Sequence, residues 1–511
     1  MHKAPLFFRF FDHELYFFDG ASKKVFKIGN EGERCVSKAL KSLDHPVFYH
    51  GCPYVVLDHQ VVARSSLIAL KRAKNRVYGM DLNCIYEIND TQDQILYKTD
   101  EVILDFITDP SGDGIIVHTT RKGVSPYQAT DLFWIKSPKM EPISLNNSDA
   151  VVTHFTFDED LKPYFLTDTD PYFESRGIDL YKKRVIGCNN IVMFADRHFL
   201  LATKEGVDML IECKNDILIE HPLGLTSIQE LFSDQNYLYI AGFSLTGPLK
   251  ILKAQVEPDQ PLVFDNFLDL SLDGIEFDEL PPSLELGALD PKAGKGWIVG
   301  QLQLDQPLII RIHGGPIGHV EKRITGEILA YHARGYNLIY PNYKGSTGYG
   351  RKHRLDLIGH YSEADVTDIL NLIEYLIQRG VDPKKIILKG KSSAGLTAIL
   401  ASLKVRVGAL CIYCPVTKND PEDQELVYLF PKNFDPFLLL LKVHTPMILF
   451  QGDEDTIILK KWTDMYVQEL KNRNCPIQYH VLSGVGHSIR NEIEKECLQL
   501  EEAFIYNYLK S

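Results

Sequence analysis

The chain lacks three features: an excess of positive charge, a long apolar run and a cysteine framework. It has 511 residues, a formal net charge of −13 and a pI of about 5.7. A basic face, which non-specific nucleic-acid binding requires, is therefore not expected. No stretch reaches the roughly 18 to 20 apolar residues of a membrane span. We accordingly predict neither nucleic acid nor a membrane as a partner, and we leave the oligomeric state open.

The beginning of the chain and its cysteines point to a reducing compartment. The first residues, MHKAPLFFRFFDHELYFF, are rich in aromatics but interrupted by charged residues, unlike the basic-then-apolar layout of a signal peptide. The nine cysteines are odd in number and scattered along the chain. We therefore expect a cytoplasmic protein.

One pair of cysteines has the spacing of a redox or metal motif. Cys411 and Cys414 form C-x-x-C within GALCIYCP. The segment also has the composition of a buried strand, which is the interpretation we favour, and no second pair completes a zinc site. We expect neither a metal nor an organic cofactor.

The first half of the chain, residues 1–280, is predicted to be all-β. Short apolar-aromatic runs such as ELYFFD and NYLYIAG recur, and they are separated by turn segments such as DPSGDG. Many short strands with frequent turns are typical of a barrel, a sandwich or a propeller. At about 40 residues per four-stranded blade, this length would make six or seven propeller blades.

The second half, residues 281–511, changes to alternating strands and helices. PLIIRIHGG, NLIYPN, KKIIL, GALCIY and PMILFQG have the composition of buried strands. An amphipathic helix is predicted for residues 363–379, and another from about Glu492. This alternation indicates a mostly parallel sheet covered by helices, an α/β fold. The boundary is expected near Pro281.

The most informative motif is GKSSAG, residues 390–395, which places Ser392 between a predicted strand and a predicted helix. A serine on such a sharp turn presents its hydroxyl at the sheet edge, beside the backbone N–H of the next residue. Serine becomes a good nucleophile only when a base removes its proton. Ser392 is therefore our candidate nucleophile.

Candidates for the base and the acid follow in the order that α/β-hydrolases use for Ser, Asp and His. His487 lies in the glycine-flanked loop GVGH after the predicted strand PIQYHVL, whereas His444 and His480 lie in or beside strand-like runs. The acid is either Asp453 or Asp455 in GDED. Farther upstream, the glycines of IHGGPIG leave room for backbone N–H groups to approach an oxyanion.

Together these segments resemble one known family. HGGP at residues 313–316, PNYKGSTGYG at 341–350, GKSSAG, GDEDTII and GVGH look like the catalytic domain of the prolyl oligopeptidase family, in its acylaminoacyl-peptidase and dipeptidyl-peptidase-V-like branch. The resemblance covers about residues 285–511. The family carries an N-terminal β-propeller, with which the first half is consistent.

The resemblance implies roles for individual residues. Ser392 corresponds to the nucleophile, His487 to the base and Asp455, through the family's Gly-x-x-Asp spacing, to the orienting acid. The backbone N–H groups of Gly315 and Ser393 correspond to the oxyanion hole. A separate acidic pattern, which includes Asp365 and Asp368, looks structural.

Some positions depart from the family pattern. Ala394 replaces a usual glycine, Gln451 replaces a frequent histidine, and the residues after Asp455 differ from the usual Val-Pro. Substrate preference is therefore not carried over.

We interpret the chain as a serine peptidase that acts on short peptides through an acyl-enzyme. An esterase or amidase on the same scaffold is one alternative. A non-enzymatic protein whose propeller binds a partner is another, and labelling by a serine-directed probe would distinguish it.

Overall fold

The structure is a computed structural model of the chain. It describes residues 5–11, 14–19, 24–29, 32–37, 54–57, 60–63, 67–73, 76–89, 92–109, 111–126, 128–136, 140–146, 149–157, 162–167, 187–194, 197–214, 217–233, 236–270, 284–419, 426–432, 434–489 and 491–509.

The chain divides into two compact units, which are described separately. The first comprises Met1–Thr203, Asp208–Phe243 and Pro248–Gly274. The second comprises Lys204–Val207, Ser244–Gly247 and Ile275–Ser511. The expected boundary between residues 280 and 281 lies outside the described residues.

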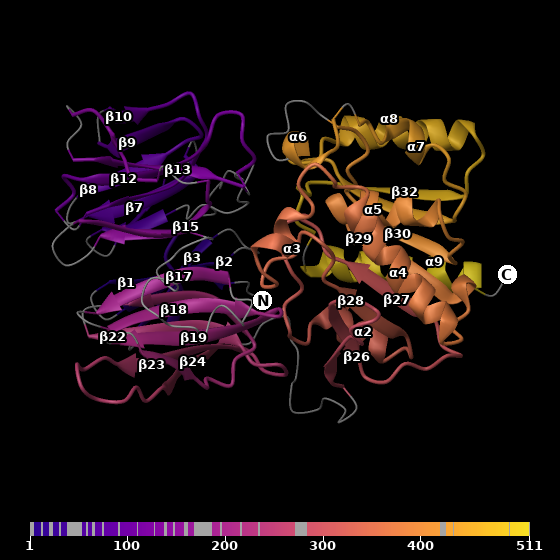
Figure 1. The fold of residues 1–511 in the computed structure, drawn as a ribbon, viewed down its shortest axis with the longest axis horizontal. Coiled ribbons are helices and arrows are strands. Elements are labelled where there is room, and N and C mark those ends of the chain that lie inside the picture. Colours follow the sequence, from indigo (N-terminus) through magenta and orange to yellow (C-terminus); the bar gives the residue numbers. More distant parts are fainter. Residues whose placement is uncertain are drawn as a thin grey trace. The chain divides into compact units, whose positions relative to one another are not determined.

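The first unit is built from antiparallel sheets (Figure 1). Its strands are β1 (Pro5–Phe11), β2 (Glu14–Asp19), β3 (Lys24–Gly29), β4 (Gly32–Cys35), β5 (Tyr54–Leu57), β6 (Gln60–Ala63), β7 (Ala69–Ala73), β8 (Arg76–Met80), β9 (Cys84–Ile88), β10 (Gln94–Lys98), β11 (Ile103–Thr108), β12 (Ile115–Thr120), β13 (Thr130–Ile135), β14 (Ile143–Ser144), β15 (Val152–Phe157), β16 (Pro163–Thr167), β17 (Gly187–Phe194), β18 (Arg197–Lys204), β19 (Val207–Lys214), β20 (Ile217–His221), β21 (Ser227–Ser233), β22 (Tyr237–Phe243), β23 (Leu249–Gln255) and β24 (Asp265–Leu270).

These strands form a β-propeller, as the sequence predicts for this half. Within the described residues, five sheets have four strands, namely β1–β4, β7–β10, β11–β14, β17–β20 and β21–β24, and the pairs β5–β6 and β15–β16 have two. Inner strands such as β12 are buried along their whole length, whereas β10 is largely exposed. The described residues thus contain five four-stranded sheets of the six or seven such blades predicted, and the number of blades in the whole unit stays a prediction.

The second unit is an α/β sheet with helices on both faces. Its strands are β25 (Leu286–Ala288), β26 (Gly296–Val299), β27 (Leu308–Ile312), β28 (Asn337–Pro341), β29 (Ile386–Lys391), β30 (Ala409–Tyr413), β31 (Met447–Gly452) and β32 (Ile477–Leu482). Its helices are α2 (Gly326–His332), α3 (Arg351–Leu355), α4 (Ala364–Gln378), the 3₁₀ helix Pro383–Lys385, α5 (Ser393–Ser402), α6 (Leu426–Leu429), α7 (Phe437–Leu440), α8 (Lys460–Asn472) and α9 (Asn491–Leu509).

The strand order in this eight-stranded sheet, as far as the residues are described, is β25-β26-β28-β27-β29-β30-β31-β32. The pairs from β28 through β27 and β29 to β32 are parallel. The carboxyl ends of these parallel strands therefore meet at one edge of the sheet. The expected α/β-hydrolase arrangement is confirmed, because the loops that carry the predicted site residues leave from this edge.

Burial on both faces explains why these strands are apolar throughout. Ile309 and Ile387 join a core cluster with Ile328 of α2 and Phe504 of α9. The alternate residues, such as Leu388, are buried on the opposite face. This continuous burial distinguishes a helix-covered parallel sheet from a half-solvated one.

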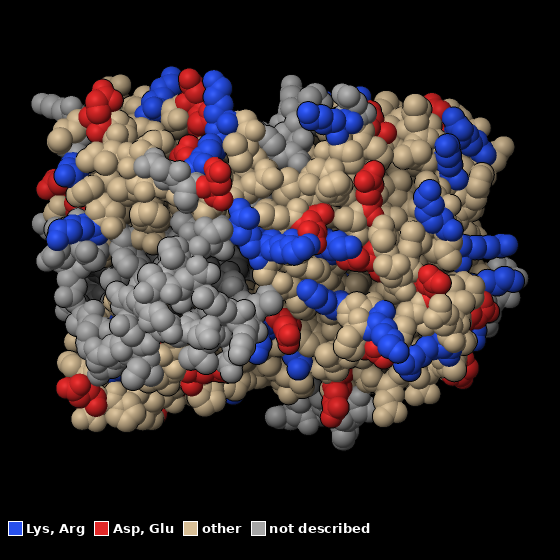
Figure 2. Space-filling model, viewed as in Figure 1, with Lys and Arg blue, Asp and Glu red and all other residues tan. Residues whose placement is uncertain are grey.

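The predicted helices occur close to their expected bounds. Residues 363–379 contain α4, Ala364–Gln378, whose buried face includes Val366 and Ile373. The terminal helix α9 begins at Asn491. None of the helices in the described ranges has the length and hydrophobicity of a membrane span. Acidic and basic side chains are interspersed on the face in Figure 2.

Candidate active site

Ser392 occupies a strained turn between β29 and α5. Its φ of 59° and ψ of −126° are unusual for a residue with a side chain. The turn is held because the Ser392 N–H donates to the Tyr413 carbonyl at 2.9 Å and its carbonyl accepts from the Gly395 N–H at 3.0 Å. At Gly390, a Cβ would lie 2.3 Å from the Ala394 carbonyl oxygen, so strand and helix meet too closely for any other residue. The geometry is that of a nucleophile elbow.

His487 and Asp455 form a hydrogen-bonded pair on two neighbouring loops. Asp455 follows β31 and His487 follows β32, and these strands are parallel neighbours in the sheet. The distance from His487 Nδ1 to Asp455 Oδ2 is 2.8 Å. The Asp455 carboxylate is 5% exposed, so this contact is largely protected from water. Such a contact fixes the orientation of the imidazole ring.

The Asp455 carboxylate is held in its charged form by several donors. Burial alone would raise its pKa, but the hydrogen bond to His487 and the backbone N–H groups of Ile457 and Ile458 lower it below the ordinary value. Both N–H groups donate to Asp455 Oδ1 at 2.9 Å. These hydrogen bonds favour the charged carboxylate more than burial disfavours it.

Gln451 supports the same carboxylate, a role that its position in the sequence did not reveal. Its Nε2 lies 3.3 Å from Asp455 Oδ2 and 3.1 Å from the Ile458 carbonyl oxygen. Its Oε1 accepts from the Thr463 hydroxyl at 2.8 Å. The glutamine, noted in the sequence only as a departure from the family, thus connects the acid loop to α8.

The alternative acid, Asp453, has a different contact. Its Oδ1 accepts from the Gly484 N–H at 2.7 Å in an exposed turn. The two loops approach closely nearby, because a Cβ at Gly452 would lie 2.2 Å from the Val485 carbonyl oxygen. Asp453 therefore braces the loop that carries His487. The other histidines lie elsewhere: His480 stacks on Phe450 at 5.2 Å, and His444 is exposed.

The glycine-rich loop after β27 is braced by the segment after β28. The Tyr343 hydroxyl donates to the His313 carbonyl at 2.9 Å, and the His313 ring stacks on Tyr343 with centroids 4.3 Å apart. His313 Nε2 lies 2.8 Å from Ser346 Oγ. Burial lowers the pKa of His313 to about 3, so this ring is neutral at physiological pH. The two motifs HGGP and PNYKGSTGYG are thus parts of one structure.

This loop also approaches the turn that carries Ser392. A Cβ on Gly314 would lie 2.6 Å from the Lys391 carbonyl oxygen. Gly315 follows with a φ of 56°. Ser393 is the first residue of α5, where backbone N–H groups have no partner within the helix. The loop that contains Gly315 and the turn that precedes Ser393 therefore lie close together.

Cys414 is the neighbour that the sequence interpretation missed. Its Sγ, a carboxylate oxygen of Asp455 and a ring nitrogen of His487 all lie within 4.8 Å of one another. Burial raises the pKa of the Cys414 thiol to about 12, so the thiol stays protonated. The favoured interpretation of C-x-x-C as a buried segment is confirmed: Cys411 lies in β30, and Cys414 is buried just beyond it.

These three groups have the elements of a metal site but not its spacing. A tetrahedral zinc ion would separate two nitrogen or oxygen ligands by about 3.4 Å. The 2.8 Å between Asp455 and His487 is instead a hydrogen-bond length. The residues present therefore fit proton transfer better than metal coordination.

The acidic pattern on α4 makes contacts within the fold. Asp365 is fully buried and its Oδ2 accepts from the Thr397 hydroxyl of α5. Asp368 accepts from the backbone N–H and the Nζ of Lys344 at 2.8 and 3.2 Å. Each carboxylate thus ties α4 to a neighbouring segment, as a structural role requires.

The chain is similar in sequence to several known proteins. A model of the prolyl oligopeptidase family matches residues 324–425. The chain is 25% identical over 219 residues to the acylamino-acid-releasing enzyme of Rattus norvegicus, covering 37% of this chain and 29% of that protein. It is 32% identical over 91 residues to acylamino-acid-releasing enzyme 1 of Oryza sativa subsp. japonica, covering 18% and 12%. The matches span less than a third of the length of either relative.

Solved structures extend the likeness of fold to the whole chain. The structure of a puromycin-hydrolyzing peptidase from Mycobacterium tuberculosis superposes with a TM-score of 0.83 at 14% identity, covering 99% of this chain and 95% of that one. Together with the family match to residues 324–425, these relatives show that the chain is similar to proteins of the prolyl oligopeptidase family.

Proposed function

We propose that the chain is a serine peptidase that hydrolyses short peptides, with Ser392, Asp455 and His487 as its catalytic triad. The observation that carries this proposal is the 2.8 Å hydrogen bond between Asp455 and His487, on loops at the same sheet edge as the Ser392 turn. Similarity to the prolyl oligopeptidase family supports the reaction class. The names of the similar proteins, which refer to acylamino acids and puromycin, support small acylated or peptide-like substrates.

In this mechanism, His487 accepts the hydroxyl proton of Ser392 as Ser392 Oγ attacks the carbonyl carbon of the substrate. The resulting oxyanion accepts hydrogen bonds from the N–H groups of Gly315 and Ser393. The protonated imidazole then gives its proton to the leaving amine, and the C–N bond breaks to leave an ester on Ser392. Water, deprotonated by the same imidazole, attacks this ester and releases the acid.

Asp455 acts on His487 rather than on the substrate. Its Oδ2 accepts a hydrogen bond from the Nδ1–H group, so the proton stays on Nδ1 and Nε2 is the nitrogen free of a proton. Its carboxylate also stabilises the imidazolium that forms during attack. Gln451 and the N–H groups of Ile457 and Ile458 keep that carboxylate in place.

A substrate panel tests the proposal directly. Short peptide amides with free, acetylated and proline-containing N-termini are compared with simple esters, using the wild-type chain and Ser392→Ala. We expect amide hydrolysis that Ser392→Ala abolishes. Turnover of esters without hydrolysis of any peptide amide would contradict the peptidase assignment and favour an esterase.

A cytoplasmic location is part of the same proposal. It rests on the odd number of cysteines and on the free thiols of seven of them, Cys35, Cys84, Cys213, Cys411, Cys414, Cys475 and Cys497. Fractionation of cells with an antibody against the chain tests it, and recovery outside the cytoplasmic fraction would contradict it.

A further inference from the structure

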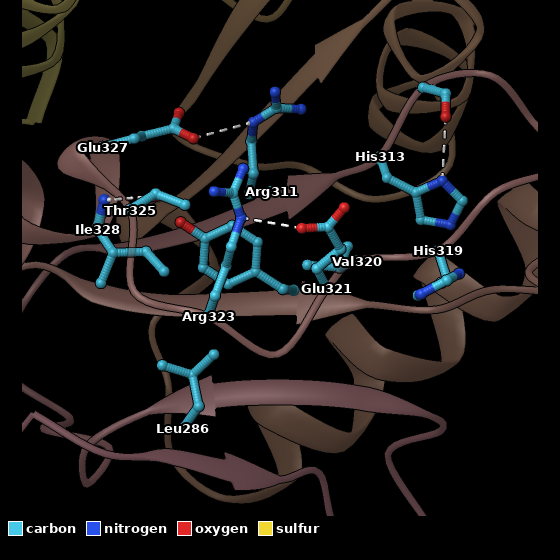
Figure 3. Close-up of a pocket in the computed structure, with 12 residues that line it drawn as sticks. Leu286, Arg311, His313, His319, Val320, Glu321, Arg323, Thr325, Glu327 and Ile328 are labelled. Carbon is cyan, nitrogen blue, oxygen red and sulfur yellow. Dashed lines mark hydrogen bonds and ion pairs between the residues drawn. The ribbon is translucent and has the colours of Figure 1, made fainter. Parts of the chain in front are cut away.

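The second unit contains a cavity beside the loop that joins β27 to α2. Its volume is about 250 Å³. Leu286, Val320 and Ile328 form apolar walls, and the guanidinium groups of Arg311 and Arg323 lie together between them (Figure 3). Such a space is smaller than most pockets for drug-sized ligands but large enough for a small organic molecule.

Three buried polar atoms on the wall of this cavity have no hydrogen-bond partner among the described residues. They are the Tyr340 hydroxyl, His319 Nε2 and Arg311 Nε, and the last of these has an ion pair with Glu327 at 3.5 Å. Tyr340 is 6% exposed, and burial raises the pKa of its hydroxyl well above the ordinary value, so the group stays a donor. A buried polar group without a partner is costly, and native proteins rarely leave one without a ligand or water.

The carboxylates near the cavity already have cationic partners. Glu327 lies 2.7 Å from Lys389 Nζ and 3.5 Å from Arg311 Nε. Burial alone would raise the pKa of Glu327, but these two cations lower it to about 2. Glu321 lies 2.9 Å from Arg323 Nε. Both carboxylates are thus engaged, whereas the Tyr340 hydroxyl still has a proton to donate.

The buried ammonium group of Lys389, behind the cavity wall, is also paired with carboxylates. Lys389 Nζ, which is 2.7 Å from Glu327, is also 2.7 Å from Glu501. The cations therefore share their carboxylates, and an added anion would accept from the Tyr340 hydroxyl without displacing a buried ion pair. Charge-assisted hydrogen bonds to such an anion are about twice as strong as neutral ones.

We propose that this cavity binds a small organic carboxylate with one aliphatic group. Its carboxylate accepts from Tyr340 and Arg311, and its aliphatic part packs on Leu286, Val320 and Ile328. A branched fatty acid and an N-acylated amino acid share this chemistry, and the test separates them.

This site is separate from the proposed catalytic centre. Ser392, Asp455 and His487 are not among its lining residues. The cavity does border His313 and Gly314, which precede Gly315 in the glycine-rich loop. The inference rests on the cavity and its unpaired donors, so it does not depend on the peptidase assignment.

Isothermal titration calorimetry tests the proposal with N-acetyl-L-leucine, its amide and isovalerate. We expect the full-length chain to bind at least one of the two acids, and the amide to bind at least about tenfold more weakly than N-acetyl-L-leucine if that acid binds. Binding of isovalerate alone identifies a fatty acid as the ligand type. Absence of binding by both acids at millimolar concentration would overturn the proposal.

Two variants and one control locate the bound acid. Tyr340→Phe removes only the hydroxyl, and Arg311→Lys keeps the charge beside Glu327 while removing Nε. We expect each to weaken binding about tenfold or more with an unchanged unfolding temperature. Tyr375→Phe, on α4 and outside the cavity, is expected to bind like the wild type. Unchanged affinity in Tyr340→Phe would overturn the assignment.

A further titration decides whether the acid binds in this cavity or at the catalytic centre. The titration is repeated after treatment with a fluorophosphonate that blocks the nucleophilic serine. Binding should persist at the same affinity in the labelled chain. Loss of binding would place the acid at the catalytic centre and overturn the inference.

Discussion

Replacement of Asp455 by asparagine changes one atom of the carboxylate and reverses one hydrogen bond. Asp455 Oδ1 accepts from two backbone N–H groups, and Oδ2 accepts from His487 Nδ1 at 2.8 Å. An amide has only one oxygen. If that oxygen keeps the backbone donors, the NH₂ group faces Nδ1 and selects the imidazole tautomer that carries its proton on Nε2. That tautomer cannot accept the proton of Ser392.

The size of the expected effect follows from this tautomer. Loss of the proper tautomer with the geometry retained lowers kcat by about 10⁴. At about 1.36 kcal/mol for each factor of ten, the barrier rises by about 5.5 kcal/mol. KM is expected to change little, because Asp455 does not contact the substrate in the proposed mechanism.

Asp453→Asn is the matched control, two residues away in the same loop. Asp453 accepts one hydrogen bond, from the Gly484 N–H, and an amide oxygen can accept it equally well. An exposed substitution of this kind changes free energies by at most about 0.5 kcal/mol, or about twofold in rate. Steady-state hydrolysis of a chromogenic peptide amide measures both variants. If Asp455→Asn stays within tenfold of wild type, or Asp453→Asn loses more activity, the assignment of the acid is refuted.

Three further results are expected. Gly315→Val should lower kcat about 100- to 1000-fold in a folded protein, because a side chain crowds one oxyanion donor; near-normal turnover would remove Gly315 from the oxyanion hole. Burial raises the pKa of the Asp365 carboxyl from 3.8 to about 6. The protonated carboxyl therefore stabilises the fold fully below pH 3.8, and this contribution is lost as the pH rises through about 6. The stability of wild type relative to Asp365→Asn should therefore fall by about 3 kcal/mol between pH 4 and pH 7 in urea unfolding, and a constant difference would contradict the shift. Cys414, buried and with its pKa raised to about 12, should resist iodoacetamide at pH 8 while the exposed Cys35 reacts, as peptide mapping would show; equal modification of both would contradict this burial.

Local sequence patterns predicted individual strands and helices in both halves of the chain. In the first half, ELYFFD coincides with β2, and in the second half, PLIIRIHGG contains β27. The α4 prediction differed from the structure by one residue at each end. Apolar periodicity and glycine stops are properties of neighbouring residues, so they can be found without knowing the fold.

Features that depend on distant residues could not be predicted in this way. Asp453 and Asp455 have the same local surroundings in the sequence, and only the return of β32 beside β31 brings His487 to one of them. Gln451 and Cys414 approach the same carboxylate from strands that are adjacent in the sheet. The sequence around Gln451 and Cys414 looks like that of any buried strand, so it does not predict that these residues lie near the Asp455 carboxylate.

The residues of the cavity wall could not be predicted from sequence patterns either. Arg311 and Tyr340 each lie in an apolar strand, β27 and β28, where a single polar residue predicts nothing by itself. Whether the Tyr340 hydroxyl and Arg311 Nε find a hydrogen-bond partner depends on the groups that neighbouring elements place beside them.

Covalent labelling of Ser392 tests the central claim most directly. The intact chain is treated with a fluorophosphonate probe, digested, and mapped by mass spectrometry, with Ser392→Ala treated in parallel. The account predicts one adduct on Ser392, no labelling of Ser392→Ala, and labelling that is slower by orders of magnitude in His487→Ala. An adduct on a different residue, or undiminished labelling of Ser392→Ala, would contradict it.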